Sequence, residues 1–352
     1  MKRISLLFQF LIISIIIVGQ PPENYYTTTQ GKYGQELMVV LNGIIKNHTA
    51  ISYSEVWTAF HETDAKDDGK VWDMYTNCVF TFGDDQDTGS GGTTECDVYN
   101  REHSFPASWF GGSTSSIMYT DLFHLYPTDK KVNATRANYP FGEVGSASYT
   151  SNNGSKLGSS SYTGYSGIVF EPIDEYKGDF ARSYFYMATR YYDLMHSWST
   201  PITNGTQYPA FNEWVINLLT EWHESDPVSE KEVNRNNAIY NNFQHNRNPY
   251  IDHPEFIARI WGDETNAQTI AHTFSIKIFP NPASDWVKVS TNEHGPIEVN
   301  IYNLIGESVK RVILKSNMGP FEIDTNDLTN GVYLVRVITN STNKTFRLSI
   351  NK

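Results

Sequence analysis

The spacing of apolar residues changes partway along the chain, and the change predicts two structural parts. Up to about residue 262, apolar residues recur at steps of three and four, which is the period of a helix buried on one face. Two polar stretches rich in Gly, Ser and Thr, at 84–94 and 145–167, interrupt this pattern. We expect helices over residues 33–51, 53–60, 179–198, 209–222 and 227–244.

From Phe274 onward the period falls to two, which predicts strands. Apolar residues alternate over 274–278, 287–289, 299–301 and 332–337, and Asn281-Pro282 and Asn330-Gly331 are turn signals. About 80 residues of short strands indicate a small β-sandwich. We therefore predict an α+β protein with a mostly helical domain over 24–262, a polar linker over 263–273 and an all-β domain over 274–352.

The N-terminus has the composition of an export signal. Lys2 and Arg3 precede an apolar run from Ile4 to Val18, and prolines follow at 21 and 22. The run is about 15 residues long, shorter than the ~20 that a bilayer-spanning helix needs. We interpret residues 1–20 as a signal peptide, so we expect a secreted or cell-surface protein that is exported through the periplasm. A membrane anchor is the alternative.

Cys78 and Cys96 are the two cysteines of the chain. An even pair in an exported protein favours a disulfide, and closing a loop of about 18 residues is worth roughly 3 kcal/mol. The alternative is a pair of buried thiols. A zinc site fits poorly, because no His partner stands at zinc spacing.

The net charge of −12 argues against a nucleic-acid partner, because phosphate binding is driven by Lys and Arg. Residues 272–352 carry nine Lys or Arg and seven Asp or Glu, and Lys2 and Arg3 add two more positive charges. The stretch between them therefore carries −16. A protein with this balance needs a local basic cleft, a bound cation or both to bind phosphate.

One segment nevertheless contains the groups that phosphodiester hydrolysis requires. It reads Asn100-Arg-Glu-His-Ser-Phe-Pro106, then Asp121-Leu-Phe-His124-Leu-Tyr-Pro127, then Lys131-Val-Asn133-Ala-Thr-Arg136-Ala-Asn138. A histidine suits removal of a proton from water, and a hard divalent cation takes carboxylate and amide oxygens as ligands. Outside a known family, an adjacent Glu and His are more often a surface glutamate next to a histidine packed in the core than parts of an active site. His124 resembles a core histidine, and Asp121 fits a helix cap as well as a metal ligand.

The local structure expected for this segment is compatible with such a site. Residues 130–138 can form a short helix that Pro140 stops, and Asn133 and Arg136 would then share one face. Glu102 and His103 are adjacent, and adjacent strand residues point to opposite faces. Both side chains can therefore reach one site only where the strand ends or bulges, and the nearby Pro106 is compatible with such an end.

The three blocks together, in this order, resemble the bacterial endonuclease I family of periplasmic and extracellular nucleases, which carry a ββα-metal (His-Me finger) site. The resemblance covers roughly residues 30–260. It implies a non-specific endonuclease that hydrolyses DNA, with RNA as a second candidate substrate and His103 as general base. Glu102 and Asn133 match the ligands of Mg²⁺, or of another divalent cation such as Mn²⁺ or Ca²⁺. Arg136 and Asn138 match positions that support the helix and the phosphate.

The family uses a further arginine between the strand and the helix to hold the scissile phosphate, and residues 104–132 contain none. Arg101 and Lys131 are the substitutes that the sequence offers. Downstream stretches that also resemble the family contain Arg182 and Arg247 as candidate phosphate contacts. The alternative is that residues in those stretches have structural roles, as helix caps, turns and buried ion pairs.

The last 80 or so residues resemble the type A sorting domain of the type IX (Por) secretion system. The matching features are Ile278-Phe-Pro-Asn-Pro-Ala283, Val299-Asn-Ile-Tyr-Asn303, Asn330-Gly-Val-Tyr-Leu-Val335 and the basic finish at Lys352. This implies that type IX secretion machinery is a partner of the chain. A carbohydrate- or surface-binding sandwich is the alternative.

The resemblances lead us to expect a monomeric secreted nuclease whose substrate is nucleic acid. Two other classes of function remain open on the sequence. One is a secreted binding or adhesion protein with an inactive nuclease-like fold, which suits the acidic charge. The other is a secreted phosphoesterase for small substrates, which would cleave a chromogenic diester and leave plasmid intact.

Overall fold

The computed structural model describes residues 21–262, 276–291, 297–314, 321–339 and 343–352. The expected signal peptide (1–20) and linker (263–273) lie outside the described residues. The chain divides into two compact units, Met1–Ala267 and Gln268–Lys352. Within the described residues, no helix combines the length and the apolar character that a membrane crossing requires.

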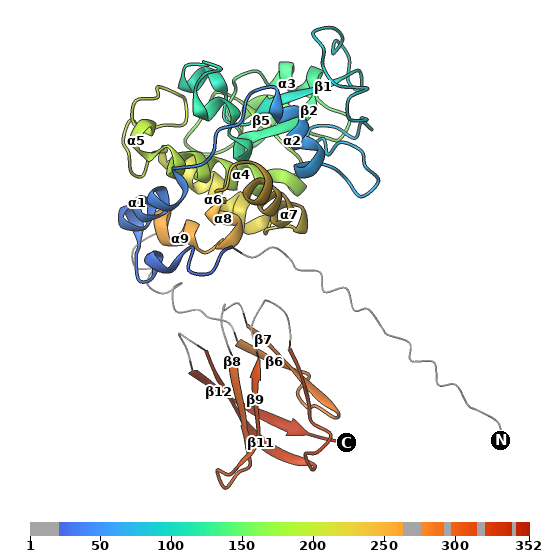
Figure 1. Cartoon of the computed structure of the whole chain (residues 1–352), viewed down its shortest axis with the longest axis vertical. Coiled ribbons are helices and arrows are strands. Elements are labelled where there is room, and N and C mark those ends of the chain that lie inside the picture. The colour runs from blue at the N-terminus through green and yellow to red at the C-terminus, as the bar shows by residue number, and fades with distance from the viewer. Residues whose placement is uncertain (1–20, 263–275, 292–296, 315–320, 340–342) are drawn as a thin grey trace, which may run out of the picture. The chain divides into compact units, whose positions relative to one another are not determined.

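The first unit is built around one deeply buried helix, α4, which packs against α1 and α6 (Figure 1). Nearly every residue of α4 from Tyr176 to Arg190 is buried, so the helix is enclosed on all sides. The helices expected from the apolar spacing are present with shifted ends. The longer helices are α1 (Gly34–Ile45), α2 (Glu55–Thr63), α3 (Lys130–Arg136), α4 (Asp174–Arg190), α6 (Glu213–Ser225) and α7 (Glu230–Ala238), and the short ones are α5 (Tyr192–Met195), α8 (Pro249–Asp252) and α9 (Phe256–Trp261).

Two small antiparallel sheets complete this unit. In the first, β1 (Tyr99–His103) pairs with β2 (Leu125–Asp129), so that Glu102 lies opposite Tyr126 and His103 opposite Leu125. The second has the order β3 (Val144–Thr150), β4 (Lys156–Ser160), β5 (Ile168–Glu171), and its first two strands fall in the Gly/Ser-rich stretch that shows no strand pattern in the sequence. A side chain at Gly158 would place its Cβ 2.0 Å from the carbonyl oxygen of Ser146, so this strand pairing needs a glycine there.

The second unit consists of two antiparallel sheets that share one apolar core. One sheet has the order β10-β7-β6 and the other β12-β11-β8-β9. The strands are β6 (Ile276–Phe279), β7 (Trp286–Thr291), β8 (Ile297–Tyr302), β9 (Ser308–Leu314), β10 (Phe321–Asp324), β11 (Gly331–Ile338) and β12 (Asn343–Ile350). The structure therefore confirms the α+β class and the small sandwich.

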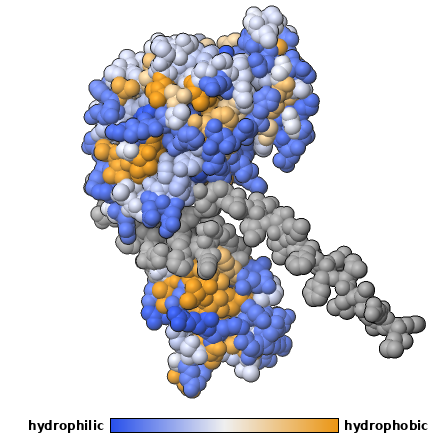
Figure 2. All heavy atoms as spheres, viewed as in Figure 1, coloured by the Kyte–Doolittle hydropathy of each residue, from blue (hydrophilic) through white to orange (hydrophobic). Residues whose placement is uncertain are grey.

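Hydropathy differs over the surface of each unit (Figure 2). On the face shown, the first unit is mostly hydrophilic or intermediate with separate apolar patches, whereas apolar residues gather on the second unit. Exposed apolar side chains of the second unit include Val309, Ile313 and Leu334 on β9 and β11, and Leu304 and Ile305 in the turn before β9.

Candidate active site

The two strands β1 and β2 and the helix α3 form one compact motif, because α3 starts at the residue after β2. Asp129, the last residue of β2, caps the helix by accepting a hydrogen bond from the Val132 N–H at 2.9 Å. Its second oxygen accepts from the Cys96 N–H at 2.7 Å. This carboxylate thus fixes the start of α3 and joins it to the disulfide loop.

Glu102 points from β1 toward α3 and is almost fully buried. Its Oε1 accepts hydrogen bonds from the Tyr75 hydroxyl and from Arg136 Nη1, both at 2.8 Å. Burial raises the pKa of Glu102, and the charge of Arg136 and the Tyr75 hydrogen bond oppose that rise. Among the described residues, nothing donates a hydrogen bond to Oε2, so one carboxylate oxygen remains available for a ligand.

Asn133 lies on α3 against the same face of β1, where its Nδ2 donates to Asn100 Oδ1 at 2.8 Å. That bond uses the amide nitrogen and leaves Oδ1 without a partner in the described part of the chain. Glu102 and Asn133 therefore each offer an oxygen, which suits Mg²⁺, since this ion takes one or two protein ligands and keeps several waters. No cluster of three or more His, Cys, Asp or Glu side chains able to hold a metal occurs among the described residues.

His103 ends β1 and points to the opposite face from Glu102. Its ring lies 4.4 Å from the Tyr119 ring and 6.3 Å from the Tyr53 ring, centroid to centroid. Within the described residues, no direct contact joins this ring to Glu102 or Asn133. Arg136 bridges the two faces instead, because Nη1 also donates to the His103 carbonyl oxygen at 2.9 Å.

The tautomer of His103 follows from one hydrogen bond. Nε2 donates to the Tyr119 carbonyl oxygen at 2.9 Å, so Nδ1 carries the free lone pair. Nδ1 has no partner in the described part of the chain and is not sealed from solvent. Burial, together with the neighbouring His124 and the Arg101 charge, lowers the pKa of His103 from 6.5 to about 3, although the hydrogen bond to the Tyr119 carbonyl opposes the fall. The ring is neutral at physiological pH and can accept a proton.

The Tyr119 carbonyl is held in place by a buried network around Asp121, which is fully buried just after the 3-10 turn Ile117–Thr120. Asp121 Oδ2 accepts from the hydroxyls of Tyr186 and Tyr191 on or next to α4, at 2.9 and 2.8 Å. Burial opposes its charge, yet His48, His124 and the Gln244 hydrogen bond hold the pKa of Asp121 below its ordinary value. This network attaches the Tyr119 segment to the central helix α4, and the Tyr119 segment in turn orients His103.

Arg101 shares the His103 face of β1, two residues earlier. Its guanidinium carbon lies 3.4 Å from the Tyr53 ring centroid and 4.4 Å from the Trp57 ring centroid, and Nη1 donates to the Tyr53 carbonyl at 2.5 Å. Among the described residues, no carboxylate lies within ion-pair distance of it. A half-buried cation held between two rings beside His103 is therefore available to an anion.

The other candidates lie in different environments. Arg182 and Arg247 are fully buried in ion pairs with Glu232 and Asp252, which favours a structural role for both. Lys131 is partly exposed on α3, and Asn138 is exposed just beyond that helix. Arg136, the catalytic and phosphate-binding candidate on α3, is also fully buried, which favours a role in positioning Glu102 and the end of β1.

Three contributors to this site were not singled out from the sequence: Tyr75, Asn100 and Tyr119. Tyr75 and Asn100 act through hydrogen bonds to Glu102 and Asn133, and Tyr119 acts through its main chain. Asn100 stands two residues before Glu102, so period-two alternation on β1 could have placed it on the same face. A backbone carbonyl contact and a tyrosine 27 residues away leave no comparable signal.

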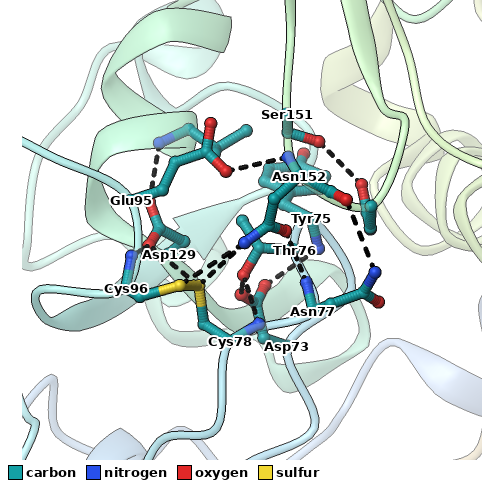
Figure 3. Close-up of a disulfide and its surroundings, with 12 residues drawn as sticks. Asp73, Tyr75, Thr76, Asn77, Cys78, Glu95, Cys96, Asp129, Ser151 and Asn152 are labelled. Carbon is teal, nitrogen blue, oxygen red and sulfur yellow. Dashed lines mark hydrogen bonds between the residues drawn. A yellow bond between two sulfur atoms is a disulfide. The ribbon is translucent and has the colours of Figure 1, made fainter.

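The predicted disulfide between Cys78 and Cys96 is present, with the two Cα atoms 5.1 Å apart (Figure 3). The Asn152 side chain in the β3–β4 turn donates Nδ2 toward both sulfurs, at 3.3 and 3.4 Å. Glu95 accepts from the Asn152 N–H at 2.8 Å. The bridge therefore connects the segment before β1, the β3–β4 turn and, through Asp129, the start of α3.

We expect replacement of both cysteines by serine to lower the free energy of unfolding by roughly 3 kcal/mol, because the unfolded chain loses the loop constraint. The activity of the site should also fall, since the Cys96 N–H no longer holds Asp129 firmly at the α3 cap. Urea unfolding of the two proteins measures the difference. Dithiothreitol should destabilise the parent and leave the double variant unchanged, and equal unfolding curves for both proteins would contradict the prediction.

Comparison with known proteins places both units in families. The sequence matches Endonuclease I over residues 33–255 and the Secretion system C-terminal sorting domain over residues 277–351. It is 36% identical over 254 residues to a protein named extracellular ribonuclease from Bacillus amyloliquefaciens, covering 70% of this chain and 81% of that one. A second extracellular ribonuclease, from Bacillus subtilis (strain 168), is 36% identical over 252 residues, covering 68% and 78%.

These matches confirm both resemblances seen in the sequence. The sorting domain and the extracellular relatives show that the protein is secreted or bound to the cell surface and that secretion machinery is its partner. The first unit makes it a nuclease, so nucleic acid is its substrate. The chain is a secreted nuclease that belongs to the endonuclease I family.

Proposed function

We propose that this nuclease hydrolyses phosphodiester bonds by a one-histidine mechanism that depends on a divalent cation, with Mg²⁺ as the leading candidate. The observation that carries the proposal is the hydrogen bond from His103 Nε2 to the Tyr119 carbonyl. It leaves Nδ1 as a neutral base at the open end of β1, ready to take a proton from an attacking water. Glu102 Oε2 and Asn133 Oδ1 are the oxygens that would hold the cation.

Residues on the two faces of β1 have different roles in the proposed mechanism. The cation, when bound, supplies positive charge for the phosphoryl oxygens and the leaving oxygen. On the His103 face, Arg101 takes the role of phosphate contact, because its guanidinium is held by Tyr53 and Trp57 and no described carboxylate lies within ion-pair distance of it. Lys131 and Asn138 are secondary candidates at the two ends of α3. Arg136 keeps Glu102 and the end of β1 in place.

The proposed substrate class includes both RNA and DNA. The relatives are named extracellular ribonucleases, which favours RNA as one substrate. Contacts through a cation and a guanidinium are contacts to the phosphate, so cutting should depend little on base sequence. We further propose that the protein is a monomer after removal of the signal peptide 1–20, with a catalytic domain over 24–262, a linker over 263–273 and a sorting domain over 274–352.

The test is digestion of plasmid DNA and a long RNA in parallel, each with Mg²⁺ and with excess EDTA. We expect cleavage of both polymers with Mg²⁺, a loss of at least about a hundredfold with EDTA, and recovery when Mg²⁺ is restored. Undiminished digestion in EDTA would remove the cation from the proposal. Digestion of RNA alone would restrict the substrate class and leave the chemistry standing.

A further inference from the structure

The nuclease unit must recognise a polyanion with few free cations. Residues 4–271 carry a charge of −16, and six basic side chains in the described part of this stretch are buried in ion pairs: Arg136, Lys177, Arg182, Lys231, Arg235 and Arg247. Each of these cations is neutralised by its carboxylate partner, so fewer positive charges remain at the surface. Attraction to phosphate, which supplies most non-specific nucleic-acid binding, is therefore weak here. Recognition has to draw on contacts other than charge.

The surface offers such contacts in two adjoining hollows of about 450 and 610 Å³, which share Tyr165 and Pro201. We call them together the Tyr165 groove. Residues 137–140 and Ile168 line one hollow. The other is lined by residues 163–165 and by the start of α6 with Trp214.

Aromatic rings are prominent along this groove. The Tyr165 ring is stacked on the Trp214 ring, with centroids 4.6 Å apart and planes 14° apart. The chain reaches this position because Gly164 has φ +97° and lies so close to Trp214 that an added Cβ would be 2.8 Å from the Trp214 Cβ. Tyr139, in the other hollow, is 41% exposed. Tyr139 presents its ring to solvent, and Tyr165 is partly exposed between Trp214 and Gly167, so both can be contacted at low entropic cost on binding.

One hollow of the groove is lined by the residues directly after α3, the helix that carries Asn133. Tyr139 follows α3, and its N–H donates to the Arg136 carbonyl at 3.2 Å. Asn138 is five residues after Asn133, so their Cα atoms are at most about 18 Å apart. That is a span of a few nucleotides. A strand cut at Asn133 and His103 therefore has its neighbouring bases within reach of this groove.

We propose that the Tyr165 groove is a base-stacking subsite that binds unpaired nucleotides next to the scissile phosphate. Bases stack on Tyr139 and Tyr165, which any base can do because every base has a π face. The amides of Asn138, Asn212 and Asn217 line the groove and can hydrogen-bond base edges. Glu213 at the rim keeps phosphates turned toward solvent. This inference rests on the proposed function, and it makes single strands the preferred substrate.

Binding in EDTA tests the subsite apart from catalysis. We would measure the fluorescence anisotropy of short fluorescein-labelled oligo(dA) and oligo(A) with the full secreted protein. Tyr165→Ala and Tyr139→Ala should each weaken binding about tenfold, the loss of one stacked base. Tyr165→Phe should bind normally, because it retains the ring. Leu194→Ala serves as the matched control, since Leu194 is 44% exposed and lines neither hollow.

Turnover with Mg²⁺ supplies the second readout. Both alanine variants should raise KM for the oligonucleotides and leave hydrolysis of bis(p-nitrophenyl) phosphate unchanged, because this small diester does not reach the groove. Unchanged oligonucleotide affinity in both alanine variants, or equal losses on the oligonucleotides and the small diester, would overturn the subsite. Weakened binding in a protein that cleaves nothing would support the subsite and count against the proposed function alone.

Discussion

Replacing His103 by alanine should lower kcat on plasmid DNA and on RNA by about 10²- to 10⁴-fold, which is the usual contribution of a positioned general base. The reason lies in the end of β1, where the Tyr119 carbonyl fixes the tautomer and leaves Nδ1 as acceptor. Alanine leaves no group there to take the proton from water. The affinity for an oligonucleotide in EDTA should change little, because the imidazole is a base rather than a phosphate ligand.

Two controls separate chemistry from folding in this experiment. His196→Ala removes an exposed imidazole on the same unit and should keep full activity. Added imidazole should restore part of the rate of His103→Ala, since the small ring can enter the space left between Tyr53 and Tyr119. If His103→Ala digests plasmid within tenfold of the parent while its thermal unfolding is unchanged, His103 is not the base.

The sequence allowed prediction of those parts of the site that depend on neighbours in the chain. The downstream Pro140 predicted a short helix over 130–138, which the structure has over Lys130–Arg136, and an exported even pair predicted the bond between Cys78 and Cys96. The opposite orientations of Glu102 and His103 follow from strand alternation. Each of these rests on spacing within a few residues or on composition.

The rest of the site depends on contacts between distant segments. Arg101 is available to phosphate because Tyr53 and Trp57, more than forty residues earlier, enclose it. Arg182 and Arg247 are unavailable because Glu232 and Asp252 lie beside them in the fold. The periodicity of a single sequence shows which face of a helix or strand is apolar. It does not show which buried arginine pairs with which carboxylate. The choice among the candidate arginines therefore required the structure.

The sheet β3–β4–β5 illustrates a second limit. Its strands β3 and β4 are rich in Gly, Ser and Thr, so the alternation of apolar and polar residues that marks a strand is missing there. The pairing depends instead on a close approach at Gly158, where a side chain would meet the Ser146 carbonyl. Strand propensity measures fit to a half-buried surface, and β3 is mostly exposed. The same sheet leads into the loop that carries Tyr165.

Replacing Arg136 by methionine should lower the free energy of unfolding by about 3–5 kcal/mol, the usual effect of removing one partner of a buried ion pair. Arg136 is fully buried, and its fork joins four acceptors: Glu102 Oε1, the carbonyl oxygens of His103 and Ser104, and the Tyr184 hydroxyl. Methionine fills a similar volume and leaves the Glu102 charge without a counterion. Activity should fall in parallel, because β1 loses the link between its two faces.

A double-mutant cycle with urea unfolding identifies the cause. Glu102→Gln in the Arg136→Met background should recover part of the lost stability, since it removes the buried charge that methionine cannot balance. Lys131→Met takes the same charge from a partly exposed position of the same helix and should change stability by no more than about 0.5 kcal/mol. A loss below 1 kcal/mol for Arg136→Met, or no recovery on neutralising Glu102, would show that the pair does not hold the motif together. The motif would then depend on the Asp129 cap and on the packing of Val132, and Arg136 would have to be explained by the reaction itself.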